Sequence, residues 1–445
     1  MEHGPTFFFL LSTLVLAVSV KSPPPPLFPD EALPTNSGYL SVKPATDSSM
    51  FYAFYEAQKP TTLLPDTPLL VWLQGGPGCS SMIGNFYELG PWRVMSSATE
   101  LERNPGAWNR LFGLLFVDNP IGVGFSIASS KQDIPTNQRQ VAEHLYAALV
   151  EFLEQNPGFE NRPVYFTGES YAGKYVPAIG YYILKEKPNG TVNLKGLAIG
   201  NGLTDPVTQV QTHAVNVYYS GLVNAKQRVE VEKAQEISVA LVKSQKWREA
   251  ADARTELLTL LSNMTGLATL YNTARSIPYR TDLVVDLLNQ GEAKRVLGVS
   301  ETMRFEDCSD EVEDVLREDV MKSVKFMVEY ALERTQVLLY QGMLDLRDGV
   351  VSTEEWMKTM NWSGLGMFST AERRVWKDED GAVAGYVQRW GNLCHVAVSG
   401  AGHFVPTDEA VNSRDMIEGW VLGKGLFGGN EDMKQTISSS FYNSI

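Results

Sequence analysis

The chain has 445 residues, of which 38 are Lys or Arg and 52 are Asp or Glu, so its formal net charge is −14 at pH 7. This acidic balance argues against nucleic acids and anionic membrane surfaces as partners, because both attract basic proteins. Hydrophobic residues make up 44% and charged residues 20%, which is typical of a globular protein, and the length fits two or three domains or one large domain with insertions.

The N-terminal residues 1–22 are predicted to be a signal peptide. Phe7–Val20 form an apolar run that is too short to span a membrane comfortably but has the length of a signal-peptide core. Ala17 and Ser19 are small residues that suit cleavage nearby. No Lys or Arg precedes the run, so a signal anchor or a buried strand is the alternative. We expect a mature chain of residues 23–445 that enters the secretory pathway without stable insertion in a membrane.

Three Asn-x-Ser/Thr triplets begin at Asn189, Asn263 and Asn361. In a secreted chain they are candidate glycosylation sites on surface loops. The secretory route also makes one disulfide possible among the three Cys. The chain has no C-x-x-C or H-E-x-x-H motif and its five His are scattered, so we expect no metal site and no cofactor. No pattern in the sequence indicates an oligomeric state.

Short apolar runs alternate with helical patterns along most of the chain. The runs predict a strand pair and six buried strands: Tyr39–Val42 with Phe51–Glu56, then Leu69–Gln74, Leu111–Asp118, Val164–Thr167, Leu194–Gly200, Val337–Tyr340 and Leu393–Ser399. Residues 137–155 and 171–184 are predicted to be helices. This alternation favours a mainly parallel α/β sheet. Residues 205–305 break the pattern with helical periodicity and are predicted to form a mostly helical insertion over the sheet.

Ser170 is a candidate nucleophile in the segment GESYAG, between a predicted strand and a predicted helix. A sharp strand–turn–helix needs small residues two before and two after the nucleophile, and Gly168 and Ala172 meet that need. Ala172 departs from the strict G-x-S-x-G form. A tight turn with a helix-capping Ser is the alternative.

A serine nucleophile needs a base, and the base needs an orienting carboxylate. His403 lies in a Gly-rich loop just after the last predicted strand, whereas His395 lies within that strand and is expected to be a packed residue. Asp345 closely follows the strand Val337–Tyr340 and is the preferred acid; Asp348 is the competing choice.

A second Gly-rich turn, Gln74–Ser81, follows the strand Leu69–Gln74. It lacks the Lys of a phosphate-binding loop. In a hydrolase such a loop lets a backbone N–H reach a developing oxyanion, so we expect Gly76 and Tyr171 to supply the oxyanion-hole N–H groups. The alternative is a plain turn.

Taken together, these segments resemble the serine carboxypeptidase family, specifically its plant-type serine carboxypeptidase-like group. The resemblance is carried, in family order, by WLQGGPGCSS (72–81), ELGPWRV (88–94), NPGAWNRLFGLLFVDNPIGVGFS (104–126), TGESYAGKYVP (167–177), IGNGLTDP (199–206), DLLNQGEAKRVLGV (286–299), GMLD (342–345) and GAGHFVP (400–406). It implies an α/β-hydrolase fold with a mostly parallel central sheet and a helical cap insertion at about 205–305.

The resemblance also implies roles for individual residues. Ser170, Asp345 and His403 match the catalytic triad, and Gly76 and Tyr171 match the oxyanion hole. Gln74, Gly75 and Glu169 match the positions that bind the terminal carboxylate of the substrate; Gln74 stands where the family usually has Asn. Cys79 matches a cysteine often bridged to one after the cap, here Cys308, with two free thiols as the alternative. Phe404 matches a position lining the pocket for the departing residue and suggests an apolar one.

The resemblance implies a serine carboxypeptidase that acts on peptides with a free C-terminus. Two carboxylates in hydrogen-bonding range share a proton, so binding a C-terminus through Glu169 should favour acidic pH. A vacuolar lumen would suit such an enzyme, as would secretion. Two alternatives are an acyltransferase that uses glucose esters as acyl donors and an inactive secreted binding protein.

Overall fold

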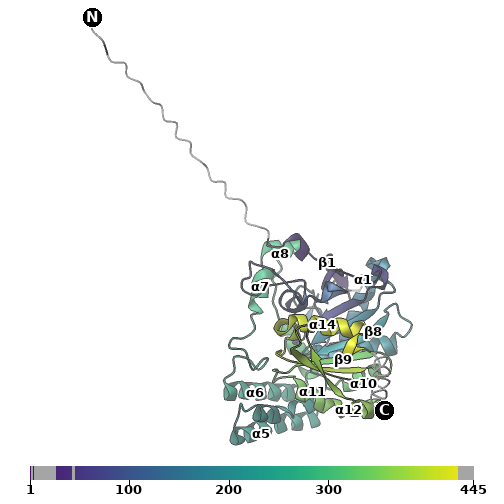
Figure 1. Ribbon diagram of the computed structural model, residues 1–445, viewed down its shortest axis with the longest axis vertical. Coiled ribbons are helices and arrows are strands. Elements are labelled where there is room, and N and C mark those ends of the chain that lie inside the picture. The colour runs from purple at the N-terminus through teal and green to yellow at the C-terminus, as the bar shows by residue number, and fades with distance from the viewer. Residues whose placement is uncertain (2–3, 5–26, 43–45, 429–445) are drawn as a thin grey trace, which may run out of the picture.

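The computed structural model describes residues 1, 4, 27–42 and 46–428. The predicted signal peptide therefore lies outside the described residues, apart from Met1 and Gly4. A ten-stranded sheet crosses the molecule (Figure 1). Its strand order is β1-β2-β6-β3-β7-β8-β9-β12-β11-β10. In that order the strands span Asn36–Ser41, Ser49–Tyr55, Gly113–Val117, Leu69–Leu73, Val164–Glu169, Leu194–Gly200, Gln336–Gly342, Leu393–Val398, Val383–Trp390 and Arg373–Lys377.

The six central strands, from β6 to β12, pair in parallel, and the outer strands pair antiparallel. The predicted strands are all present with small shifts at their ends. The sheet is mostly parallel with helices on both faces, as predicted for the α/β-hydrolase fold. A small separate sheet pairs β4 (Trp92–Arg93) with β5 (Glu102–Arg103).

The continuous apolar runs follow from burial of the sheet on both faces. In β3, Leu69 and Val71 pack with α1 and α2, whereas Leu70 and Trp72 pack on the opposite face with α14. The helices span α1 Gln138–Gln155, α2 Ala172–Tyr181, α3 Pro206–Val210, α4 His213–Tyr219, α5 Ala225–Lys243, α6 Trp247–Thr265, α7 Asp282–Leu288, α8 Gly291–Val296, α9 Asp310–Leu316, α10 Lys325–Leu332, α11 Val350–Met357, α12 Leu365–Thr370, α13 Val405–Asp408 and α14 Ala410–Val421.

The first predicted helix begins one residue later than its pattern suggested. Asn137 is its N-cap, and the side-chain oxygen of Asn137 accepts a hydrogen bond from the Gln140 N–H at 3.1 Å. Such a cap satisfies one of the N–H groups that the first turn leaves without a helical partner.

The helical segment between β8 and β9 packs in two places. Helices α5 and α6 lie side by side at one end of the molecule, whereas α7 and α8 lie at the opposite end (Figure 1). Leu283 and Leu287 of α7 share a buried cluster with Phe28 and Tyr55 from the N-terminal part of the chain. Residues 282–305 therefore pack with the first strands rather than with α5 and α6.

Strands β10 and β11 were not predicted from the sequence. Most side chains of β10 are exposed, and two of them are Arg373 and Arg374, so the strand has no continuous apolar run. Charged residues on an edge strand discourage pairing with another chain.

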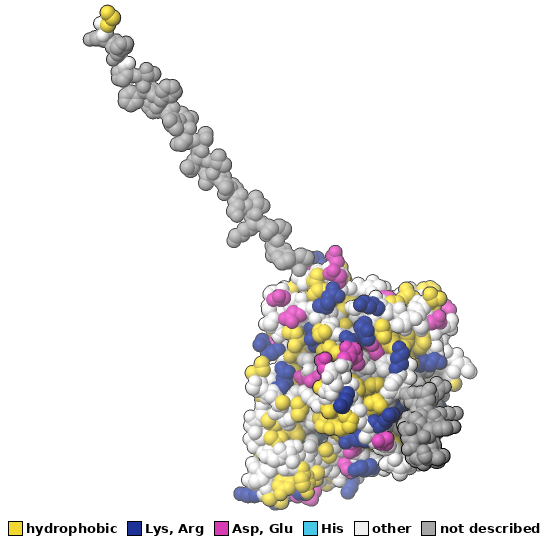
Figure 2. Space-filling view, in the orientation of Figure 1, with side chains coloured by type: hydrophobic (Ala, Val, Ile, Leu, Met, Phe, Trp, Pro, Cys, Tyr) yellow, Lys and Arg dark blue, Asp and Glu magenta, His cyan; other side chains and the backbone are white. Residues whose placement is uncertain are grey.

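Basic and acidic side chains are interspersed on the face of the molecule shown in Figure 2. In the described part of the chain, no helix is both long enough and apolar enough to cross a membrane.

Candidate active site

Ser170 lies at the tip of a sharp turn between β7 and α2. Its φ of 59° is in the left-handed region, which non-glycine residues rarely occupy, and its N–H donates to the Gly200 carbonyl at 3.0 Å. A Cβ on Gly168 would lie 2.5 Å from the Leu73 carbonyl oxygen and 2.7 Å from the Ala172 Cβ. The turn therefore requires glycine at 168 and leaves room only for a small residue at 172.

His403 lies in the loop between β12 and α13. Its Nδ1 contacts Asp345 Oδ2 at 2.7 Å, and both side chains are buried. Its backbone N–H donates to the Tyr271 carbonyl at 2.7 Å, and the Tyr271 ring stacks on the imidazole with centroids 4.3 Å apart. His403 Nε2 has no hydrogen-bond partner among the described residues. The imidazole is thus held through one nitrogen and lines the same cavity as Ser170.

Asp345 follows β9 and is held by donors from several segments. Asn201 Nδ2 donates to Oδ2 at 2.8 Å, and the Arg347 backbone N–H donates to Oδ1 at 2.7 Å. The competing Asp348 instead pairs with Arg254 at 3.3 Å, with both side chains buried. The structure therefore brings Asp345, and not Asp348, to His403. Asn201 had no role in the sequence analysis, although its segment was among those that carried the resemblance.

His395 lies within β12, as expected, and its Nε2 contacts Gln341 Oε1 at 2.8 Å. Burial lowers the pKa of His395 to about 3, with a further lowering by Arg373. The structure therefore places this neutral imidazole in the sheet and does not bring it to Ser170.

The Gly-rich loop after β3 packs against the turn that carries Ser170. A Cβ on Gly75 would lie 2.6 Å from the Tyr171 nitrogen and 2.7 Å from the Ser170 Cβ, so only glycine allows this approach. Gly76 has a φ of 113°. Among the described residues, neither the Gly76 N–H nor the Tyr171 N–H donates a hydrogen bond within the protein. Two free donors of this kind beside a nucleophile can stabilise an oxyanion.

Gln74 holds two buried carboxyl groups next to the same cavity. Its Nε2 donates to Glu169 Oε1 at 2.8 Å and to Glu88 Oε1 at 3.1 Å, and its Oε1 accepts from Trp72 Nε1 at 2.9 Å. Burial raises the pKa of Glu88 to about 7, although the hydrogen bonds from Gln74 and Glu169 act to lower it. Burial, then the adjacent Glu88, raises the pKa of Glu169 well above its usual range.

Glu88 was missed by the sequence analysis as a site residue. It lies in the π-helical segment Gly84–Leu89, all of which is buried. Its position at the start of the segment 88–94 was the only available signal, because an isolated Glu in a helical pattern usually faces solvent.

Phe404 lies beside His403 in an aromatic cluster. Its ring centroid is 4.6 Å from that of Tyr279 and 5.6 Å from that of Tyr271. All three rings line the cavity of about 270 Å³ that also contains Ser170, Gln74 and Glu169.

Cys79 and Cys308 form a disulfide, as the resemblance implied, and it joins the Gly-rich loop to the segment before α9. Cys394 is a buried free cysteine in β12, and burial raises the pKa of its thiol to about 12. The Asn residues of the three sequons are exposed; Asn189 and Asn361 lie outside helices, whereas Asn263 lies in the last turn of α6.

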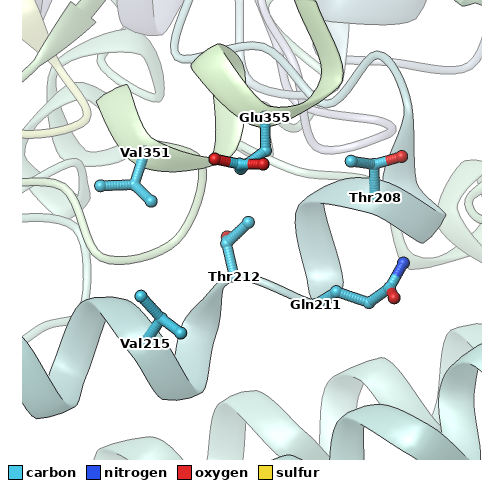
Figure 3. A pocket seen from close by; sticks show the side chains of 6 residues that line it. All are labelled: Thr208, Gln211, Thr212, Val215, Val351 and Glu355. Carbon is cyan, nitrogen blue, oxygen red and sulfur yellow. The ribbon is translucent and has the colours of Figure 1, made fainter. Parts of the chain in front are cut away.

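A cavity of about 390 Å³ lies apart from Ser170, where side chains of α11 face those of α3, α4 and Thr212 (Figure 3). It is lined by Thr208, Gln211, Thr212, Val215, Val351 and Glu355. None of the predicted site residues belongs to it.

The chain is similar to known proteins both in sequence and in structure. The family model described as serine carboxypeptidase matches residues 26–423. Serine carboxypeptidase-like 50 from Arabidopsis thaliana is 92% identical over 445 residues, which is 100% of both chains. The probable serine carboxypeptidase CPVL from Rattus norvegicus is 36% identical over 402 residues, or 87% of this chain and 83% of the relative. The crystal structure of Kex1, a prohormone-processing carboxypeptidase from Saccharomyces cerevisiae, matches with a TM-score of 0.78 at 25% identity, covering 87% of this chain and 91% of that one.

Proposed function

The chain belongs to the serine carboxypeptidase family, and we propose that it removes C-terminal amino acids from peptides with Ser170, His403 and Asp345 as its catalytic triad. The observation that carries this proposal is the 2.7 Å contact between His403 Nδ1 and Asp345 Oδ2, beside a cavity that His403 shares with Ser170. Because the carboxylate holds Nδ1, Nε2 is the nitrogen that can accept a proton.

In the proposed reaction, Ser170 Oγ attacks the carbonyl carbon of the last peptide bond while His403 Nε2 takes the hydroxyl proton. The carbonyl electron pair moves to the oxygen, which the Gly76 and Tyr171 N–H groups stabilise. His403 then gives its proton to the departing amine as the C–N bond breaks, leaving the peptide acyl group on Ser170. A water molecule, deprotonated by His403, attacks this ester and releases the shortened peptide. Asp345 stabilises the imidazolium at each proton transfer.

The restriction of cleavage to the last peptide bond is supported by four residues near Ser170: Gln74, Gly75, Glu88 and Glu169. Gln74, Gly75 and Glu169 line the cavity where the departing residue would sit, and Glu88 accepts a hydrogen bond from Gln74. At acidic pH the two buried carboxyl groups hold at least one proton between them. A protonated carboxyl group donates a hydrogen bond to a substrate carboxylate, whereas an ionised one repels it. Phe404 and its aromatic neighbours favour an apolar departing side chain.

We place the enzyme in an oxidising compartment, either outside the cell or in the vacuolar lumen. The Cys79–Cys308 disulfide and the exposed Asn of the three sequons support this placement. Glycosidase treatment of the protein from its native source should lower its mass. An unchanged mass together with an uncleaved N-terminus would contradict the secretory route.

The reaction type is tested by incubating the purified protein at pH 4–7 with blocked peptides and sinapoyl- or galloyl-glucose, and following products by mass spectrometry. We expect stepwise loss of C-terminal residues, and no loss with Ser170→Ala. Transfer of the acyl group from the glucose ester without peptide loss would instead indicate an acyltransferase. No product, together with no labelling of Ser170 by an organophosphate, would indicate a binding protein.

A further inference from the structure

Ser170 lies where two cavities meet. The cavity of about 270 Å³ contains Gln74, Glu169 and His403, and a second cavity of about 450 Å³ lies on the side of Tyr171 and Leu203. Both cavities share the same dividing residues: Gly76, Cys79, Ser170, Tyr271 and Cys308.

This arrangement fixes the direction of a peptide in the proposed reaction. The terminal carboxylate binds at Gln74 and Glu169, so the departing residue occupies the smaller cavity. The scissile carbonyl lies at Ser170, and the residue before it, the penultimate residue, must therefore enter the larger cavity.

Three guanidinium groups line the larger cavity, and they differ in how well they are paired. Arg254 pairs with Asp348 at 3.3 Å. Arg317 contacts Asp252 at 2.8 Å and Glu313 at 3.3 Å. Both of these arginines therefore have an acidic partner at hydrogen-bonding distance.

Arg347 is the least satisfied of the three. Its Nη1 donates to the neutral Tyr271 hydroxyl at 2.7 Å. Its Nε has no hydrogen-bond partner among the described residues and lies 3.8 Å from Asp348 Oδ2, a carboxylate that already pairs with Arg254. The Arg347 side chain is 26% exposed, compared with 7% for Arg254. A partly buried guanidinium whose ion pair is long, at 3.8 Å, and shared with a second arginine is suited to bind a further carboxylate from a ligand.

We propose that Arg347 binds the side-chain carboxylate of an acidic penultimate residue, so that the enzyme prefers peptides ending in Glu-X or Asp-X. This inference rests on the proposed carboxypeptidase function. Leu203, Leu258 and Val320 line the same cavity and provide an apolar wall for the methylene groups of that side chain. The guanidinium is also close to the reacting groups, because the Tyr271 ring that contacts it stacks on His403.

The matched substrates for the test are N-blocked dipeptides that end in phenylalanine and carry Glu, Gln or Lys as the penultimate residue. Glu and Gln have nearly the same shape, so their ratio of kcat/KM isolates the charge. At pH 5.5, where a free Glu side chain is mostly ionised, we expect the wild-type enzyme to favour Glu over Gln by about tenfold. The Lys peptide should be the poorest of the three.

In Arg347→Met the Glu-to-Gln ratio should fall to near one, whereas Arg347→Lys should keep part of it. The Arg347 backbone N–H that holds Asp345 is present in both variants. Arg304→Met is the matched control, because the Arg304 side chain is 83% exposed and lies outside both cavities. This control should keep the wild-type ratio.

Equal kcat/KM values for the Glu and Gln peptides in the wild-type enzyme would overturn the inference, and this measurement needs no variant to fold. An unchanged ratio in Arg347→Met would also overturn the role of Arg347. Both results leave the carboxypeptidase function standing. Failure to cleave any of the three peptides would contradict the carboxypeptidase function itself, and this inference with it.

Discussion

Glu88 and Glu169 accept hydrogen bonds from the same amide nitrogen, Nε2 of Gln74, and they are only 0% and 1% exposed. Neither carboxyl group has an Arg or Lys among its hydrogen-bond or ion-pair partners in the described part of the chain. Two carboxylates so close together cannot both carry a charge at low cost, so the pair retains a proton at pH values where exposed carboxyl groups are ionised.

Peptide cleavage should depend on pH through this carboxyl pair. Burial raises the pKa of Glu88 to about 7 and that of Glu169 well above its usual range, so the pair loses its proton only as the pH rises towards and above neutrality. We expect kcat/KM to fall as the pH rises through about 7, because the substrate carboxylate then loses a donor. Glu169→Gln should flatten this alkaline loss, since an amide donates at every pH. An unchanged profile in Glu169→Gln would rule out this role.

The same pair should also make stability depend on pH. The pKa of Glu88 is higher in the folded protein than its ordinary value of 4.5, so folding takes up a proton at pH values between the two. Its contribution to the free energy of unfolding is therefore complete below about pH 4.5 and is lost as the pH rises through about 7. The loss should reach up to about 3 kcal/mol by pH 8.

Urea unfolding at pH 5 and pH 8 measures this difference. In Glu88→Gln the loss should be much smaller than in the wild type, because an amide does not titrate. Glu379→Gln, at an exposed position, is the control and should behave like the wild type. If the wild type and the Glu379→Gln control both become more stable between pH 5 and pH 8, the assigned direction of the Glu88 pKa shift is contradicted.

Much of the site could be predicted from the sequence because its residues come from short motifs. Ser170 and Gly76 follow strands whose apolar runs are unambiguous, and the structure has these turns where they were expected. Glu88 and Asn201 could not be predicted in the same way, because their importance comes from contacts with residues far away in the chain. Nothing in a single Glu or Asn of a sequence indicates that its side chain will be buried against a carboxyl group.

The parallel strands were predicted for the same physical reason: strands covered on both faces must be apolar throughout. The edge strand β10 and its neighbour β11 lack this signal. The packing of α7 with Phe28 and Tyr55 could not be inferred either, because helical periodicity shows that a face is buried but not what covers it.

The choice between Asp345 and Asp348 is tested by two isosteric variants. Asp345→Asn should lower kcat by about 10³–10⁴-fold, because an amide does not stabilise the imidazolium and favours the wrong tautomer. Asp348→Asn leaves the buried Arg254 without a full charge partner, so we expect it to lower the free energy of unfolding by about 3 kcal/mol instead. Measuring kcat and urea unfolding for both variants separates these effects. A larger loss of kcat in Asp348→Asn would reverse the assignment.

The cysteines should react in a characteristic way. Cys79 and Cys308 are bridged, and Cys394 is buried with its pKa raised to about 12. Because the thiolate is the reactive form, a thiol reagent should detect no reactive group in the folded protein and a single one after unfolding without reductant. Cys394→Ser should abolish that signal. Detection of three thiols after unfolding would show that the bridge is absent in the isolated protein.

The most direct test of the central claim compares one blocked dipeptide, ending in phenylalanine, with its C-terminal amide at pH 5. If Gln74 and Glu169 bind the terminal carboxylate while Ser170 attacks the adjacent carbonyl, kcat/KM should be at least about 100-fold higher for the free acid, and Ser170→Ala should cleave neither. Equal cleavage of acid and amide, or cleavage of neither by a wild-type protein whose Ser170 an organophosphate still labels, would contradict the claim that this is a carboxypeptidase.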